Sequence, residues 1–137
     1  MKKTLSIFLI ALTIFSVLSF SVSATGVESR WNNTASTIVS LYINSNGKAS
    51  VTSNCVGITG ITTGITAETK IERKWGLLWL DVDGAEWTDT TTAKNLTATH
   101  EIQLTKTGTY RATTKFTVSG SGGSSDSIKC TSEDTYE

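Results

Sequence analysis

The sequence predicts an all-β protein, an antiparallel β-sandwich of about seven strands, for three reasons. Thr occurs 23 times in residues 25–137, beside many Val and Ile, and β-branched side chains fit a pleated strand better than a helix. Gly, Ser and Asn recur between the β-rich segments, as turns require. Several segments alternate between apolar and polar residues, the period of a strand with one buried face. A small closed β-barrel would show the same pattern and stays open as the alternative.

The first 24 residues have the organisation of an export signal. A basic start, Met1-Lys2-Lys3, precedes the apolar run Leu5–Val22, and Val22-Ser23-Ala24 supplies small residues for cleavage. A run of this length also suits a membrane anchor, but no cluster of positive charge follows it. We therefore expect a signal-peptide helix over residues 1–24 that is cleaved after Ala24, a flexible lead-in over residues 25–33, and one domain over residues 34–137. The protein would then be secreted and extracellular.

The first two expected strands form a hairpin. Thr37–Ile43 and Lys48–Val56 are rich in β-branched residues, and Asn44-Ser45-Asn46-Gly47 separates them. Asn-Gly favours a tight turn because both residues tolerate positive φ.

Two later segments show the clearest alternation. In Ile65–Trp75 the odd-numbered residues are expected to face the interior, with Trp75 among them. In Tyr110–Val118 the even-numbered residues are expected to do so. Each segment carries Lys, Glu, Arg or Thr on its other face, which predicts contact with water.

The region around Asp83-Gly84 allows two interpretations. Either Asp83-Gly84 turns a hairpin between Leu77–Val82 and Ala85–Thr88, or Trp75-Gly76 is the turn and Trp79–Trp87 is one irregular edge strand. The sequence does not decide between them.

The last expected strands follow this region. Thr99–Thr105 alternates, and His100 is expected to pack on the same face as Ile102. Ser127–Ser132 is expected to be the final strand, after a flexible Gly and Ser run and before an acidic end, residues 133–137, that is expected to fray.

Five stretches in chain order carry a resemblance: Ala35-Ser36, Asn46-Gly47-Lys48-Ala49, Ile71-Glu72-Arg73-Lys74, Trp79 with Trp87, and Lys106-Thr107-Gly108-Thr109-Tyr110-Arg111-Ala112. Together they resemble a family of small secreted proteins of Gram-positive gut bacteria, of unknown function, with an immunoglobulin-like sandwich domain. The resemblance implies that fold and no function. In such folds Gly-x-Tyr begins a late strand as a tyrosine corner, whose hydroxyl bonds to backbone upstream. Tyr110 occupies that place, and Ala112 stands where antibody domains have a disulfide cysteine.

The two cysteines suggest a disulfide. Cys55 shares a face with Val51, and Cys130 with Ile128, so both are expected to point inward. In an oxidising compartment two cysteines favour one bridge. Closing this loop would stabilise the fold by roughly 4 kcal/mol in the chain-entropy model. Two separate buried thiols are the alternative.

Trp79, Trp87, Asp81 and Asp83 are the candidate binding residues. Flat aromatic surface beside carboxylates suits a sugar or a protein partner, although one or two of the four tryptophans are expected to fill the core. Asp81 and Asp83, with Glu86, also resemble part of a calcium loop, but the remaining ligand positions are missing. No metal site is therefore predicted.

Charge and composition exclude several functions. Without Lys2 and Lys3 the chain carries ten basic and twelve acidic residues, a net charge of −2, and so lacks the clustered positive charge of a nucleic-acid-binding protein. One His and two Cys cannot form a His₃ or Cys₄ zinc site, and no catalytic constellation or cofactor motif is recognised. We expect a secreted, non-enzymatic, monomeric binding module without cofactors, whose partner is an unknown protein or carbohydrate. The alternative is a membrane-active toxin or bacteriocin-like protein that inserts amphipathic hairpins.

Overall fold

The computed structural model describes residues 31–137. The predicted export segment, its cleavage site and residues 25–30 of the predicted lead-in lie outside the described residues. The described part contains seven strands and no helix. The strands are β1 (Thr34–Ile43), β2 (Lys48–Gly57), β3 (Thr62–Trp75), β4 (Leu78–Thr91), β5 (Asn95–Gln103), β6 (Gly108–Gly120) and β7 (Asp126–Tyr136).

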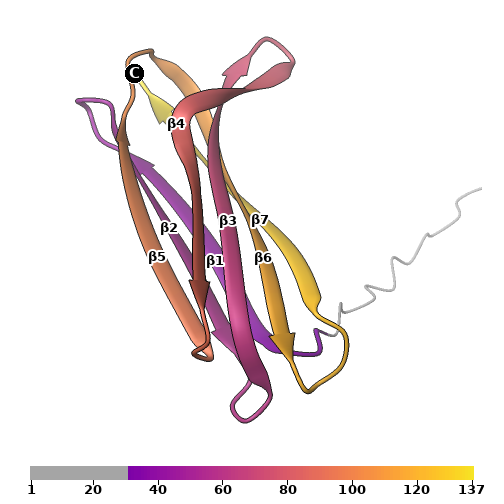
Figure 1. Ribbon diagram of the computed structural model, residues 1–137. Helices are drawn as coiled ribbons and strands as arrows, with labels where there is room; N and C mark the ends of the chain where they lie inside the picture. The colour runs from indigo at the N-terminus through magenta and orange to yellow at the C-terminus, as the bar shows by residue number, and fades with distance from the viewer. Residues whose placement is uncertain (1–30) are drawn as a thin grey trace, which may run out of the picture.

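The strands form two antiparallel sheets that pack face to face (Figure 1). One sheet has the order β1-β2-β5 and the other has the order β4-β3-β6-β7. The predicted sandwich is confirmed, and the closed barrel is excluded because β4 and β5 do not pair. In a constant-type immunoglobulin domain the fourth strand belongs to the first sheet, whereas here β4 pairs with β3 in the second sheet.

The core lies where the alternation predicted it. All five even-numbered residues of β6 from Tyr110 to Val118 are buried, as are the odd-numbered residues of β3 from Ile65 to Ile71. Val51 and Cys55 of β2 face them from the other sheet and are fully buried. The two clearest sequence patterns therefore form the central strands of the sandwich.

The pairing of β3 with β4 is interrupted by a large bulge. Lys70 pairs with Glu86 but Glu72 pairs with Asp81, so residues 82–85 of β4 lie opposite a single residue of β3. Gly84 has a φ of +74°, a conformation that glycine adopts without strain. Strand β4 bends sharply in its upper part (Figure 1). Asp83-Gly84 is therefore a bend within one irregular edge strand, and the hairpin turn is at Gly76, as the second interpretation proposed.

The expected burial of Trp75 is wrong: its exposed fraction is 63%. Trp75 pairs with Leu78 at the end of the β3–β4 hairpin. Beyond the bulge this hairpin no longer faces the other sheet, so a residue on the inward side of the strand meets solvent.

Three hydroxyls connect the two sheets inside the core. Ser53 of β2 lies 3.1 Å from Thr69 of β3 and 2.7 Å from Thr114 of β6, and the two threonine oxygens are 2.9 Å apart. All three residues are buried. Each hydroxyl can donate one bond and accept another, so this triangle satisfies every member without water.

Asp126 fixes the start of the described chain. Its carboxylate accepts hydrogen bonds from the backbone N–H groups of Asn32 and Asn33, both at 2.8 Å, and from the Thr34 hydroxyl. The Asn33 side chain is fully buried and donates to the carbonyls of Val118 and Ser124. Residues 32 and 33, which the sequence predicts to lie in a flexible lead-in, are thus part of the folded domain.

The Tyr110 hydroxyl donates a 2.5 Å hydrogen bond to the carbonyl of Lys106. This is the geometry of the tyrosine corner that the resemblance implied.

Side chains of β7 cover the outer edge of β1. The backbone N–H of Leu41 donates to Ser132 Oγ at 3.0 Å, and the N–H of Ile43 donates to Asp134 Oδ2 at 2.7 Å. Strand β7 continues to Tyr136, so the expected fraying of residues 133–137 is wrong.

The predicted disulfide is also wrong, because both cysteines are free thiols. Cys55 lies on β2 in one sheet and Cys130 lies on β7 in the other. The Cys130 sulfur contacts the hydroxyl of Thr37 at 3.2 Å, the residue paired with Cys55 on β1. Burial raises the pKa of the Cys55 thiol to about 11, so this thiol stays protonated and unreactive at neutral pH.

Candidate functional site

Four of the six large apolar residues that are exposed within residues 31–137 lie at the turn between β3 and β4. We call the six residues Trp75-Gly76-Leu77-Leu78-Trp79-Leu80 the apolar tip. Their exposed fractions reach 98% for Leu77, 63% for Trp75, 59% for Leu78 and 47% for Leu80. A Cβ atom added at Gly76 would meet nothing within 4 Å, so the turn stands clear of the rest of the domain. Large apolar side chains gathered outside the core indicate an interaction site.

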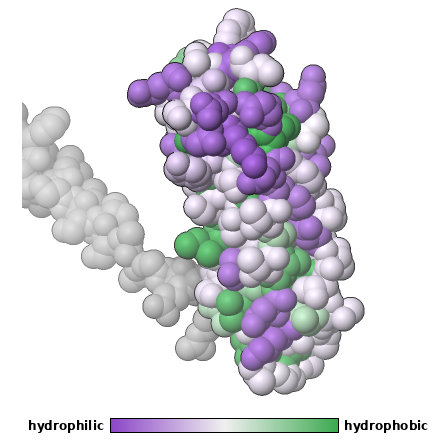
Figure 2. Space-filling view, turned by 90° about the vertical axis from the view of Figure 1, so that its left-hand side faces the viewer, coloured by the Kyte–Doolittle hydropathy of each residue, from purple (hydrophilic) through white to green (hydrophobic). Residues whose placement is uncertain are grey.

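Hydrophobic surface is more dispersed on the side of the domain that Figure 2 shows. Figure 2, which shows the side of the sandwich formed by β4 and β5, has small hydrophobic patches separated by hydrophilic side chains. Ile38 and Tyr42 of β1 are exposed to a similar degree as Trp75, but they belong to a flat strand rather than a turn.

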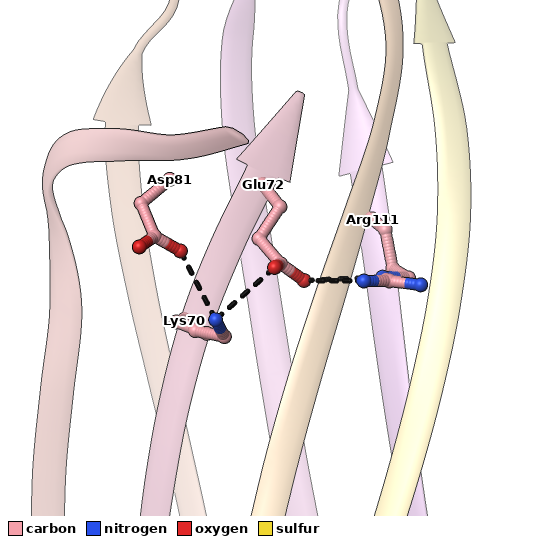
Figure 3. Close-up of polar contacts among 4 residues, drawn as sticks. All are labelled: Lys70, Glu72, Asp81 and Arg111. Carbon is pink, nitrogen blue, oxygen red and sulfur yellow. Dashed lines mark hydrogen bonds and ion pairs between the residues drawn. The ribbon is translucent and has the colours of Figure 1, made fainter. Parts of the chain in front are cut away.

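A chain of ion pairs crosses the outer face of the second sheet below the apolar tip (Figure 3). Lys70 Nζ lies 3.0 Å from Asp81 and 3.1 Å from Glu72. The second oxygen of Glu72 accepts two hydrogen bonds from Arg111, at 2.7 and 3.1 Å. The bulge creates this arrangement because it brings Asp81 of β4 opposite Glu72 of β3.

The network shifts the pKa values of Lys70 and Glu72 in the directions that keep both groups charged. Hydrogen bonds to Asp81 and Glu72 raise the pKa of Lys70. Burial opposes ionisation of Glu72, but the hydrogen bonds from Arg111 and Lys70 outweigh it and lower its pKa. Both groups are thus held in their charged forms, which suits structure or recognition and leaves neither poised for proton transfer at neutral pH.

Trp79 covers the end of this network. The Arg111 guanidinium carbon lies 4.2 Å from the centre of the Trp79 ring, and Lys74 Nζ lies 6.0 Å from it. Both distances allow cation–π attraction. Of the predicted binding residues, Trp79 and Asp81 are therefore joined in one site.

Trp87 belongs to a different part of the molecule. It pairs with the buried Thr69, packs against the core, and stacks on the His100 ring of β5 at 4.8 Å between centroids. His100 Nε2 lies 2.7 Å from Asp89 of β4. This cluster links the edges of the two sheets, so the predicted shared platform of Trp79 and Trp87 is not formed.

Asp83 lines a hollow of about 400 Å³ between the bent part of β4 and the β5–β6 connection. Leu80, Val82 and Leu104 contribute apolar walls, and Arg73 and Lys106 contribute positive charge.

A second hollow, of about 620 Å³, lies on the outer face of the second sheet. Its lining includes Glu68, Lys70, Glu86, Lys115 and Thr113. The Thr113 hydroxyl is buried and has no hydrogen-bond partner among the described residues. The mixed charges give this hollow no single electrostatic character.

Residues 31–137 contain no group of three or more His, Cys, Asp or Glu side chains placed to hold a metal ion. No helix in this range is both long and apolar enough to cross a membrane. His100 and Asp89 form a hydrogen-bonded pair at the edges of β4 and β5. Neither cysteine belongs to this pair, because Cys55 lies in the core and Cys130 contacts Thr37.

No family model, curated protein or solved structure matches this chain. The comparisons therefore identify no family, and the resemblance to secreted Gram-positive proteins stays a prediction.

Sequence reasoning placed Trp79 and Asp81 in the candidate site but missed the apolar tip and Arg111. The signal for the tip is visible in the sequence. Five of the six residues 75–80 are large and apolar, around a glycine where the chain can turn, whereas core strands of this protein alternate.

Proposed function

We propose that this protein is a secreted, non-enzymatic binding module that contacts its partner with the apolar tip. The exposure of Trp75, Leu77, Leu78 and Leu80 in one turn carries the proposal. The sandwich core is complete without these side chains, so their apolar surface is not explained by folding.

The charged network supports the same role. Ion pairs join Lys70, Glu72 and Arg111 on the outer face, and Trp79 lies across Arg111 beside the turn. Side chains that are already held by partners before binding lose less conformational entropy on binding, which favours affinity.

The test is a protein-partner and glycan array probed with the wild type and two double variants. Leu77→Ser with Leu78→Ser removes apolar surface from the tip, and Ile38→Ser with Tyr42→Ser removes comparable surface from β1. We expect ligands that the wild type and the β1 variant both bind and that the tip variant loses. Ligands retained by the tip variant but lost by the β1 variant would contradict the proposal.

A pore-forming role is less well supported than binding. Insertion of the β3–β6 face into lipid would expose Glu72, Lys70 and Arg111, which is costly in hydrocarbon. The binding module is therefore expected to leave dye-loaded liposomes intact, and dye release at micromolar protein would favour the toxin instead.

A further inference from the structure

We propose that the partner of the apolar tip is the surface of a lipid bilayer that contains anionic lipids, and that the tip enters only its interfacial zone. The inference rests on the proposed function, because it identifies the partner of that same site. Three features of the β3–β4 hairpin support it: the order of its side chains from the turn downward, its charge, and its shape.

The rungs of the hairpin change character with distance from the turn. Leu77 lies at the apex, and the first rung pairs Trp75 with Leu78. The second rung pairs Lys74 with Trp79, and the third pairs Arg73 with Leu80. Apolar and aromatic side chains alone thus occupy the apex and the first rung, and cationic side chains join them from the second rung downward. A membrane interface changes in the same direction, from hydrocarbon to the headgroups and phosphates.

The length of this gradient fits shallow insertion. Three rungs span about 10 Å at roughly 3.3 Å per residue. Interfacial protein segments bury their apolar faces to about 5–10 Å. Leu77 and Leu78 would then reach the acyl boundary while Lys74 and Arg73 remain at the level of the headgroups.

The charges next to the tip favour anionic headgroups. Lys74 is exposed and forms no ion pair within residues 31–137. The carboxylates on the next rung of the hairpin, Glu72 and Asp81, both pair with Lys70, and Glu72 also pairs with Arg111. The network of Figure 3 therefore compensates the charge of the acidic rung and leaves Lys74 free to contact an anionic surface. The guanidinium of Arg73, by contrast, donates hydrogen bonds to the carbonyl of Thr107 at 2.8 and 3.1 Å.

The shape of the tip favours a bilayer over a second protein. The turn is narrow and stands clear, with open space around Gly76, and the hairpin bends away from β5 at the upper end of the sandwich (Figure 1). Its four exposed side chains offer less than the roughly 800 Å² per partner of a standard protein interface. A fluid bilayer closes around a small convex apolar turn without such complementarity.

The experiment is vesicle flotation with the two double variants described above. Wild type is incubated with phosphatidylcholine vesicles and with vesicles of phosphatidylcholine and phosphatidylglycerol, and tryptophan emission is recorded alongside. We expect flotation that is stronger with phosphatidylglycerol, a blue shift in emission, and no dye release. Leu77→Ser with Leu78→Ser should weaken binding at least about tenfold, given that apolar burial dominates such partitioning. The β1 variant should bind as the wild type does.

Three results would overturn the inference: no flotation of the wild type with either vesicle, equal flotation of the tip variant, or flotation accompanied by dye release. Size-exclusion chromatography with light scattering tests the alternative that a second copy of the chain binds the tip. A concentration-dependent dimer that the tip substitutions abolish, without vesicle binding, would assign the tip to a second copy of the chain. Tip-dependent binding on the array together with failed flotation would leave the proposed function standing and reject the bilayer as partner.

Discussion

At the end of the sandwich where the described chain begins, Asp126 and Asn33 are buried and every polar group shown there has a partner. At the β3–β4 end the opposite holds, because Leu77 is almost wholly exposed and Lys74 forms no ion pair among residues 31–137. The first end uses scarce buried polar groups to fix the fold. The second end leaves apolar and cationic side chains exposed to a partner. The network of Lys70, Glu72 and Arg111 lies between the two ends of the sandwich.

The contrast teaches that stability and recognition are located in different places in this domain. Substitutions near Asp126 should change the free energy of unfolding, whereas substitutions in the apolar tip should change binding with little effect on stability.

Asp126→Ala is expected to destabilise the domain the most. It removes the acceptor of two backbone N–H bonds and one hydroxyl bond in a buried site, which should cost about 3 kcal/mol. Urea unfolding measures this. Asp83→Ala, at an exposed carboxylate of the β3–β4 end, is the control and should change stability by less than about 0.5 kcal/mol. Equal losses in the two variants would remove the distinction between the ends.

Thr114→Val is expected to destabilise by about 1–2 kcal/mol, because it removes one member of the buried hydroxyl triangle and leaves Ser53 and Thr69 with one partner each. Thr113→Val is a matched control on the adjacent residue. Its hydroxyl is buried without a partner, so its removal should be neutral or stabilising. Thermal unfolding of both variants gives the comparison, and a larger loss at Thr113 would contradict it.

Acid is expected to weaken the domain through two carboxyls. Burial opposes ionisation of Asp126, but its hydrogen bonds from Asn32, Asn33 and Thr34 prevail and lower its pKa, as the network does for Glu72. A lowered pKa gives stability that is fully present above the ordinary values of 3.8 for Asp126 and 4.5 for Glu72. This stability is lost as the pH falls through the lowered values.

Unfolding titrations across this range in Asp126→Asn and Glu72→Gln separate the contributions. Each variant should show a flatter pH dependence than the wild type. An unchanged slope in Asp126→Asn would show that this carboxyl is not held ionised by the fold.

Leu77→Ser is expected to have the smallest effect on stability, within about 0.5 kcal/mol, because the side chain is 98% exposed. The same substitution should weaken vesicle binding in the flotation assay. A large loss of stability on urea unfolding would mean that the tip packs against the domain in solution.

The regular parts of the fold were predictable because side-chain alternation reports burial directly. The pattern from Tyr110 to Val118 and the Asn-Gly turn at Gly47 needed no knowledge of the other strands. The alternation and the turn are both local preferences of the sequence, and in the folded sandwich they agree with the packing of the two sheets.

The candidate site was predictable only in part, since it depends on a bulge. Trp79 and Trp87 are eight residues apart, so simple alternation places them on one face. The extra residues around Gly84 reverse that relation, directing Trp79 to Arg111 and Trp87 to His100. Neither the length of a bulge nor the long-range pairing that follows from it is encoded in a two-residue period.

The hydrogen bonds from Leu41 and Ile43 of β1 to side chains of β7 have a consequence for self-association. Backbone donors that are already satisfied cannot template an incoming strand, so this border of the sheet resists growth into fibrils. At high concentration, edge-to-edge assembly would instead have to begin at another edge strand, β4, β5 or β7.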